Sequence, residues 1–257
     1  MSRLDDDAVT FEELVAEGAA APTEGWDFSW FEGRAIEERP PWGYARLMAG
    51  RMAGATAALD VETGGGEVIA TVAPRPPLLV ATESWPPNVA IARDRLRPVG
   101  AHVVAVSDAP ALPFAAASFD LVVSRHPVIV LWEEIARVLR PGGTYLSQQI
   151  GPGTNRELTE FMTGPRPANT SRSPERAHAA AEAAGLVVRD LRACALRVEF
   201  LDVAAVVCFL RKVRWTVPDF TVDAYLGRLR AMHDLIRRDG SFVSTAQRLL
   251  VEAHRPG

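Results

Sequence analysis

The chain has few cysteines and no long apolar run. Cys194 and Cys208 are the only cysteines among 257 residues, and neither has a second cysteine or a histidine at the spacing of a metal site. We therefore expect neither a disulfide framework nor a metal site, and we interpret both thiols as packed side chains. The longest apolar run, residues 203–210, is too short to cross a bilayer.

Basic side chains are also scarce in the N-terminal segment, so this segment is not a basic arm that could bind a polyanion. Residues 1–40 hold 3 basic and 11 acidic side chains, and the whole chain has a formal charge of −4. No basic stripe is visible, so nucleic acid is not an expected partner. The first residues lack the basic-then-apolar order of a secretion signal. We expect a cytoplasmic protein with no membrane association.

What the sequence does contain is an alternation of short apolar runs and helical patterns from residue 57 onward. This alternation predicts a parallel sheet built from β-α-β units. The predicted strands lie near residues 57–61, 78–82, 102–107, 119–124, 143–150, 186–200 and 241–253. The predicted helices lie near residues 66–72, 87–97, 127–139, 174–184, 202–213 and 221–238.

Three segments follow from this pattern. Residues 1–56 form an N-terminal helical and aromatic cap, and residues 57–150 form the core. Residues 151–257 complete the same fold, with a helical insertion at about 202–238. Residues 151–175 are rich in turn-forming residues, which predicts a mobile connection. Glu133 and Arg137 lie one helical turn apart, which predicts an exposed helix-surface pair.

The most informative stretch is residues 58–67, where an apolar strand ends at Asp60 and runs into three consecutive glycines. Glycine has no Cβ to hold a ligand away from the backbone, and it permits positive φ. A helix that follows such a turn presents unpaired N–H groups to a ligand. This stretch therefore predicts a site for a nucleotide-like cofactor.

Acidic residues end the next two predicted strands. Glu83 lies 23 residues after Asp60, close to the offset at which an acid accepts ribose hydroxyls in doubly wound sheets. Asp108, followed by Ala109, could contact an adenine ring, and Trp85 could form an apolar wall for the base. The alternatives are a helix-cap role for Glu83, a turn role for Asp108 and surface packing for Trp85.

Together these motifs resemble the class I S-adenosylmethionine-dependent methyltransferases, in particular the type 11 branch. The resemblance covers about residues 57–150. It implies a Rossmann-like α/β fold with a seven-stranded sheet, helices on both faces and an antiparallel last strand. The motifs that carry it are Leu59-Asp60-Val61, Gly64-Gly65-Gly66, Glu83, the segment 108–114, Ser118-Phe119-Asp120-Leu121-Val122 and the segment 134–143.

The resemblance also implies a set of residues that bind S-adenosyl-L-methionine. Glu83 would hold the ribose, and Asp108 with Ala109 would hold the adenine. The implied cofactor-binding residues are Asp60, Glu62, Thr63, Gly64, Gly66, Glu83, Ser84, Trp85, Asp108, Ala109 and Ser124.

Glu62 departs from the pattern, because the family usually has glycine at this position. Its carboxylate could accept a hydrogen bond from the methionine ammonium of the cofactor, or it could weaken binding. We expect binding to be retained, because the other motifs stay in register.

His126 is the leading candidate for a general base or a substrate-orienting residue, since it follows the fourth core strand. It could instead cap a helix that begins at Pro127. Arg125, Gln148 and Gln149 are further substrate candidates, although the glutamines could simply satisfy the sheet edge. The aromatic residues Trp30, Trp42 and Tyr44 could roof the acceptor site or anchor the N-terminal extension.

The resulting hypothesis is an S-adenosylmethionine-dependent methyltransferase that acts on a small-molecule acceptor, as a monomer or homodimer and without a metal. The alternatives are an RNA methyltransferase and a cofactor-binding or interaction protein without turnover. A nicotinamide oxidoreductase is disfavoured by the glycine spacing and by the Asp108 segment.

Overall fold

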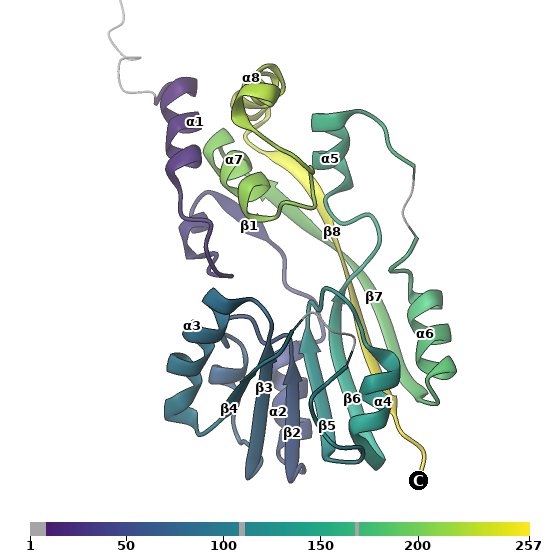
Figure 1. Cartoon of the computed structure of the whole chain (residues 1–257). Coiled ribbons are helices and arrows are strands. Elements are labelled where there is room, and N and C mark those ends of the chain that lie inside the picture. Colours follow the sequence, from purple (N-terminus) through teal and green to yellow (C-terminus); the bar gives the residue numbers. More distant parts are fainter. Residues whose placement is uncertain (1–8, 108–110, 168–169) are drawn as a thin grey trace, which may run out of the picture. The chain divides into compact units, whose positions relative to one another are not determined.

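The computed structural model describes residues 9–107, 111–167 and 170–257, and within them the chain forms an eight-stranded mixed sheet (Figure 1). The strand order is β1-β7-β8-β6-β5-β2-β3-β4. Strands β4, β3, β2, β5 and β6 are parallel, whereas β8 is antiparallel to β6. The strands span Ala35–Glu37 (β1), Ala57–Val61 (β2), Leu78–Glu83 (β3), His102–Ala105 (β4), Phe119–Arg125 (β5), Leu139–Ile150 (β6), Val187–Phe200 (β7) and Phe242–His254 (β8). The α/β fold predicted from the sequence is thus confirmed, with the short β1 added to the seven expected strands.

The chain divides into two compact units. The core unit comprises Arg39–Thr154, Asn169–Ala195 and Gln247–Gly257. The helical unit comprises Met1–Glu38, Asn155–Ala168 and Leu196–Ala246. Residues 39–56, which the sequence pattern groups with the N-terminal cap, therefore belong to the core unit.

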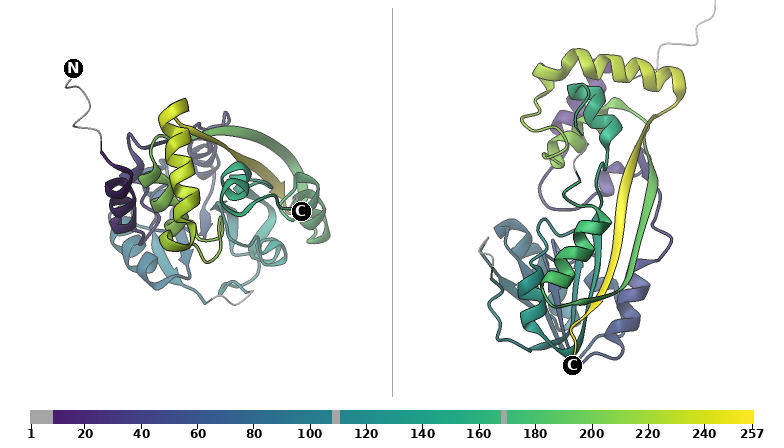
Figure 2. Two further views of the ribbon diagram at one scale, coloured as in Figure 1. Left: turned by 90° about the horizontal axis from the view of Figure 1, so that it is seen from above. Right: turned by 90° about the vertical axis from the view of Figure 1, so that its right-hand side faces the viewer.

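Apolar side chains on both faces of the parallel strands hold the core unit together. Leu59 and Val61 of β2 pack on the face that is covered by α4 (Trp132–Val138) and α6 (Pro174–Ala183). Ala58 packs on the other face, against α2 (Tyr44–Met52) and α3 (Pro86–Leu96). Helices α2 and α6 lie on opposite sides of the strands (Figure 2). All five residues of β2 are buried, as expected for a central parallel strand.

The helical unit is built from α1 (Phe11–Ala20), α5 (Arg156–Thr163), α7 (Val203–Lys212) and α8 (Val222–Asp239). Helices α7 and α8 form the expected insertion between the last two strands. Side chains cap three of these helices at Thr10, Asp202 and Thr221, which satisfies backbone N–H groups that the helices cannot pair internally. Within the described residues, no helix is both long and apolar enough to span a bilayer.

Four local predictions were wrong. The helix expected at 66–72 is only a 3₁₀ turn at Ile69–Thr71, because Pro74, Pro76 and Pro77 cannot continue a helical hydrogen-bond ladder. The helix expected at 127–139 spans only Trp132–Val138. The mobile connection expected at 151–175 contains α5. Strand β1 was not expected at all.

Candidate functional site

The glycine turn after β2 has the backbone geometry that the sequence suggests. Glu62, Gly64 and Gly66 have φ of 57°, 65° and 77°, in the left-handed region that favours glycine. A Cβ on Gly66 would lie 2.9 Å from Cγ of Leu96 in α3, so only glycine fits there. The Thr63 N–H donates to the Thr82 carbonyl at 2.9 Å, which fixes the turn against β3.

Asp60 lies at the end of β2 with its carboxyl buried. Burial raises the pKa of Asp60 from its ordinary value of 3.8 to about 7; the nearby Thr63 hydroxyl opposes this rise, and the Glu83 charge adds to it. The Thr63 hydroxyl oxygen is itself buried beside this carboxyl, and no other described residue bonds to it. The end of β2 therefore holds a buried carboxyl and a buried hydroxyl side by side.

Glu83 ends β3, one strand away from Asp60. Its Oε1 accepts from the backbone N–H groups of Ser84 and Trp85 at 2.9 and 2.8 Å. These two bonds hold the carboxylate in one orientation and keep Oε2 as a further acceptor. The Trp85 side chain is 41% exposed, so its apolar surface is available beside the carboxylate.

Glu62 has a different role from the one considered for it in the sequence. Its Oε2 accepts from the backbone N–H of Val128 at 2.6 Å, which ties the glycine turn to the loop that follows β5. Burial raises the pKa of Glu62, and hydrogen bonds from the Val128 and Ile129 backbone oppose the rise. Glu62 thus positions the 126–130 loop while it occupies a conformation suited to glycine.

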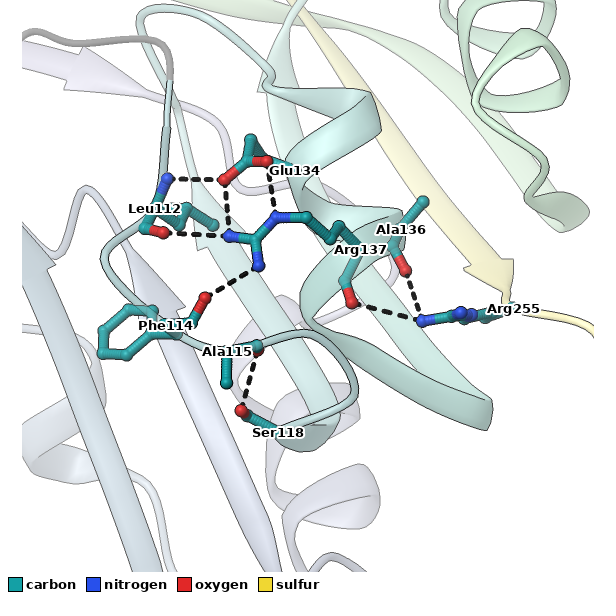
Figure 3. A network of polar contacts seen from close by, with 8 residues as sticks. All are labelled: Leu112, Phe114, Ala115, Ser118, Glu134, Ala136, Arg137 and Arg255. Atoms are coloured by element: carbon teal, nitrogen blue, oxygen red, sulfur yellow. Dashed lines mark hydrogen bonds and ion pairs between the residues drawn. The ribbon is translucent and has the colours of Figure 1, made fainter.

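A second loop of the core unit, residues 112–118, is held by α4 (Figure 3). Arg137 donates to both carboxylate oxygens of Glu134 at 2.6 and 2.7 Å, and also to the Leu112 and Phe114 carbonyls at 2.9 and 2.7 Å. The Leu112 N–H donates to Glu134 at 2.7 Å. The predicted pairing of Arg137 with Glu133 was therefore wrong, because Glu134 faces this loop. Asp108 and Ala109, just before the loop, lie outside the described residues.

His126 lies at the end of a chain of hydrogen bonds that runs through two buried side chains. The Trp42 indole donates to Oε1 of Gln148 at 2.9 Å, and Nε2 of Gln148 lies 3.0 Å from Nε2 of His126. Because indole is only a donor, the glutamine oxygen faces Trp42 and its NH₂ donates to His126. Burial holds the pKa of His126 well below its usual range, and the charges of Arg125 and Arg248 lower it further. The imidazole is therefore neutral, with its proton on Nδ1.

Tyr44 and Ser124 have structural roles. The Tyr44 hydroxyl donates to the backbone carbonyls of Ser124 and Leu146 at 2.7 and 3.2 Å. The Ser124 hydroxyl is bonded to Tyr145 and Ser147 at 2.8 and 2.9 Å. Tyr44 and Trp42 thus anchor the 39–56 segment to the strands, which was the alternative interpretation of these aromatics.

Two predicted substrate residues are not brought into this arrangement. Trp30 belongs to the helical unit, where its ring packs edge-on against Phe31 and Arg34 lies over it. Arg125 ends β5 and is exposed. Neither position tests a contact with substrate, so both assignments stay predictions.

A cavity of about 410 Å³ lies beside the loop that follows β5. Val128, Val130 and Trp132 form an apolar part of its lining, and Gln149, Arg172 and Arg176 provide polar groups. The sequence analysis did not predict the two arginines, because they flank the start of α6 in a stretch that carries no motif. Among the described residues, no cluster of His, Cys, Asp and Glu could hold a metal ion.

The groups at the glycine turn fit a cofactor that carries positive charge. Asp60, Glu62 and Glu83 are close enough that the Glu83 charge raises the pKa of both neighbours. A bound cation would offset this repulsion, which burial strengthens. S-adenosylmethionine carries a sulfonium and an ammonium group together with ribose hydroxyls that match the Oε2 acceptor of Glu83.

Comparison with known proteins points to the same fold. The chain is similar to a candidate methyltransferase of Bacillus halodurans, with 20% identity, a TM-score of 0.59, and coverage of 84% of this chain and 99% of that chain. It is similar to YcgJ of Bacillus subtilis, with 16% identity, a TM-score of 0.59, and coverage of 83% and 98%. A Haemonchus contortus phosphoethanolamine N-methyltransferase in complex with S-adenosyl-L-methionine shares 20% identity at a TM-score of 0.51 over 84% and 53%.

The sequence itself matches one family model. No curated protein matches the chain in sequence. Residues 59–147 match the model of a methyltransferase domain, and this range contains both the glycine turn and Glu83. Residues 59–147 are therefore similar to a methyltransferase domain, and the chain shares the fold of the solved methyltransferase structures to which it is similar.

Proposed function

We propose that the protein transfers the methyl group of S-adenosylmethionine to a small-molecule acceptor. The observation that carries the proposal is the acidic cluster around a glycine turn, formed by the buried Asp60 and Glu83 and the half-buried Glu62. Two of these carboxyls have raised pKa values in the protein alone. A cationic ligand would favour their ionised forms, so these shifts are expected for a site that binds one.

The residues of the core unit have distinct roles in this proposal. Glu83 accepts from the ribose hydroxyls through Oε2, while Oε1 stays bonded to Ser84 and Trp85. The glycine turn lets the backbone approach the methionine end of the cofactor. When bound, the cofactor supplies an electrophilic methyl group on a sulfonium.

We assign His126 to orienting the acceptor rather than to removing its proton. Nε2 already accepts from Gln148, and Nδ1 carries the proton, so the ring has no lone pair left for a general base. His126 can instead donate from Nδ1 to a lone pair of the acceptor. Alignment of the nucleophile with the methyl group then supplies most of the rate enhancement.

Methyl transfer to a small molecule is favoured over methyl transfer to RNA and over cofactor binding without turnover. The cavity beside the 126–130 loop has the volume of a small-molecule site, and the chain has a net charge of −4. Binding without turnover remains the second candidate, because Glu62 occupies the position at which the family has glycine.

The cofactor assignment is tested with Glu83→Gln. This change keeps an oxygen that can accept from Ser84 and Trp85, but it replaces the ribose acceptor with a donor. We expect S-adenosylhomocysteine to bind about 10- to 100-fold more weakly, as for the loss of a hydrogen bond to a charged group. Isothermal titration calorimetry measures this affinity.

Glu133→Gln, on the exposed side of α4, makes the same chemical change in the same unit and should leave the affinity unchanged. Equal affinities for wild type and Glu83→Gln would contradict the assignment of the ribose site. Absence of binding to the wild type would refute the proposed function.

A further inference from the structure

The cavity beside the 126–130 loop has features that the cofactor site does not use. It is lined within the core unit by the loop after β5, the end of β6 and the start of α6. Val128 in its lining is hydrogen-bonded to Glu62 at 2.6 Å, so the loop that borders the cavity also contacts the glycine turn. This contact links the cavity to the proposed cofactor site.

A buried amide, that of Gln149, forms part of the cavity wall. Gln149 is only 8% exposed and lines the cavity. Its side-chain nitrogen is shielded from solvent and lies beside the Tyr145 hydroxyl. This amide is therefore part of the wall rather than a free binding group.

Two arginines place positive charge at the rim. Arg172 donates from its guanidinium to the Val128 carbonyl at 3.1 Å, which holds its charge over the cavity. Arg176 lies in the first turn of α6 and also lines the cavity. Guanidinium groups bind carboxylates and phosphates with paired, charge-assisted hydrogen bonds.

The opposite part of the lining is apolar and partly open to solvent. Val128 is 63% exposed at the cavity, while Val130 and Trp132 form a further apolar wall. Water would contact this surface in the free protein, so a ligand with an apolar body gains free energy by covering it.

We propose that this cavity is the acceptor site and that the acceptor is an anion with an apolar body, whose carboxylate or phosphate binds Arg176 and Arg172. The proposal rests on the proposed methyltransferase function. It adds the chemical class of the substrate, which neither the fold nor the family match supplies.

The test uses octanoate and octyl phosphate as probes, with octan-1-ol as an uncharged molecule of the same chain length. The indole N–H resonance of Trp132 reports binding inside the cavity. We expect both anions to shift this resonance, with the tighter one identifying carboxylate or phosphate as the preferred group. Octan-1-ol should bind about ten-fold more weakly or worse.

Two variants test the polar contacts. Arg176→Gln removes one charge and leaves the helix cap intact, because the bond to Ser173 is made by the backbone N–H of Arg176. Arg172→Gln removes the other charge at the cavity. Each variant should weaken octanoate about ten-fold. Arg93→Gln, an exposed site on α3, is the matched control and should bind octanoate as the wild type does.

Equal binding of octanoate and octan-1-ol, or unchanged binding in Arg176→Gln, would overturn the proposal. A parallel titration with S-adenosylhomocysteine separates the two assignments. Binding of the cofactor product without binding of either anion would refute only the acceptor site. Competition between octanoate and S-adenosylhomocysteine would also refute it, because the two sites would then be one.

Discussion

The carboxyl of Asp60 illustrates a conflict between stability and ligand binding at a single residue. Burial raises its pKa to about 7, so its ionised form is unfavourable in the protein alone. An unfolded chain would titrate this group near 3.9. Between these two values the folded protein binds more protons than the unfolded chain, so stability falls as pH rises from about 4 to about 7.

Asp60→Asn should therefore stabilise the protein at pH 8. A difference of about 3 in pKa corresponds to about 4 kcal/mol at most. Most of the gain should be lost at pH 4, where Asp60 is protonated in the folded state and only about half ionised in the unfolded chain. Denaturant unfolding at the two pH values measures it. An equal effect of the substitution at pH 4 and pH 8 would contradict the assigned pKa.

His126 provides a second residue-scale prediction. Gln148→Glu replaces the amide donor with a carboxylate that can still accept from Trp42 while it faces the imidazole. An adjacent negative charge favours the imidazolium, so the pKa of His126 should rise by about 1–3. NMR titration of the imidazole resonances measures the change, and the exposed His178 in α6 serves as the internal control. An unchanged His126 pKa would mean that Gln148 does not face the ring.

The sequence predicted the positions of Asp60 and Glu83 because a polar residue at the end of an apolar run marks a strand end. It did not predict how Trp42 and Tyr44 are used. Their hydrogen-bond partners lie about 80 to 106 residues away, and aromatic content alone does not distinguish an anchor from a binding wall.

At the scale of elements, α4 holds the loop that follows the third predicted core strand. Arg137 and Glu134 hold the Leu112 and Phe114 backbone, and this loop directly follows the segment of Asp108. The network therefore fixes one end of a segment that the family resemblance assigns to adenine.

Arg137→Gln should lower the free energy of unfolding by about 1–2 kcal/mol, since it removes partly exposed charge-assisted hydrogen bonds. It should also speed hydrogen exchange in residues 111–118. Arg93→Gln is the control with the same charge change. If exchange in residues 111–118 were as slow in Arg137→Gln as in this control, the loop would not depend on the network.

Element predictions succeeded where one physical pattern was sufficient. Apolar runs predicted β2, β3 and β5 nearly to the residue, because buried parallel strands are apolar throughout. The short turn at Ile69–Thr71 was mistaken for a helix because the glycine motif outweighed the prolines that follow. Strand β1 has only three residues, and its pairing with residues 198–200 of β7 is not encoded locally.

At the scale of the whole molecule, the methyltransferase domain match and the proposed cofactor contacts both fall within the core unit. The helical unit comes from three separate stretches of sequence, which a linear division of the chain could not predict. The central claim is that the ends of β2 and β3 in the core unit bind S-adenosylmethionine or its product.

Hydrogen–deuterium exchange with and without S-adenosylhomocysteine tests this claim most directly. We predict slower exchange in peptides that cover residues 59–67 and 79–86, because a ligand at these strand ends would hold the glycine turn and the Glu83 backbone. Peptides from α8 should exchange at the same rate in both samples. Protection confined to other segments, or no protection at saturating ligand, would contradict the account.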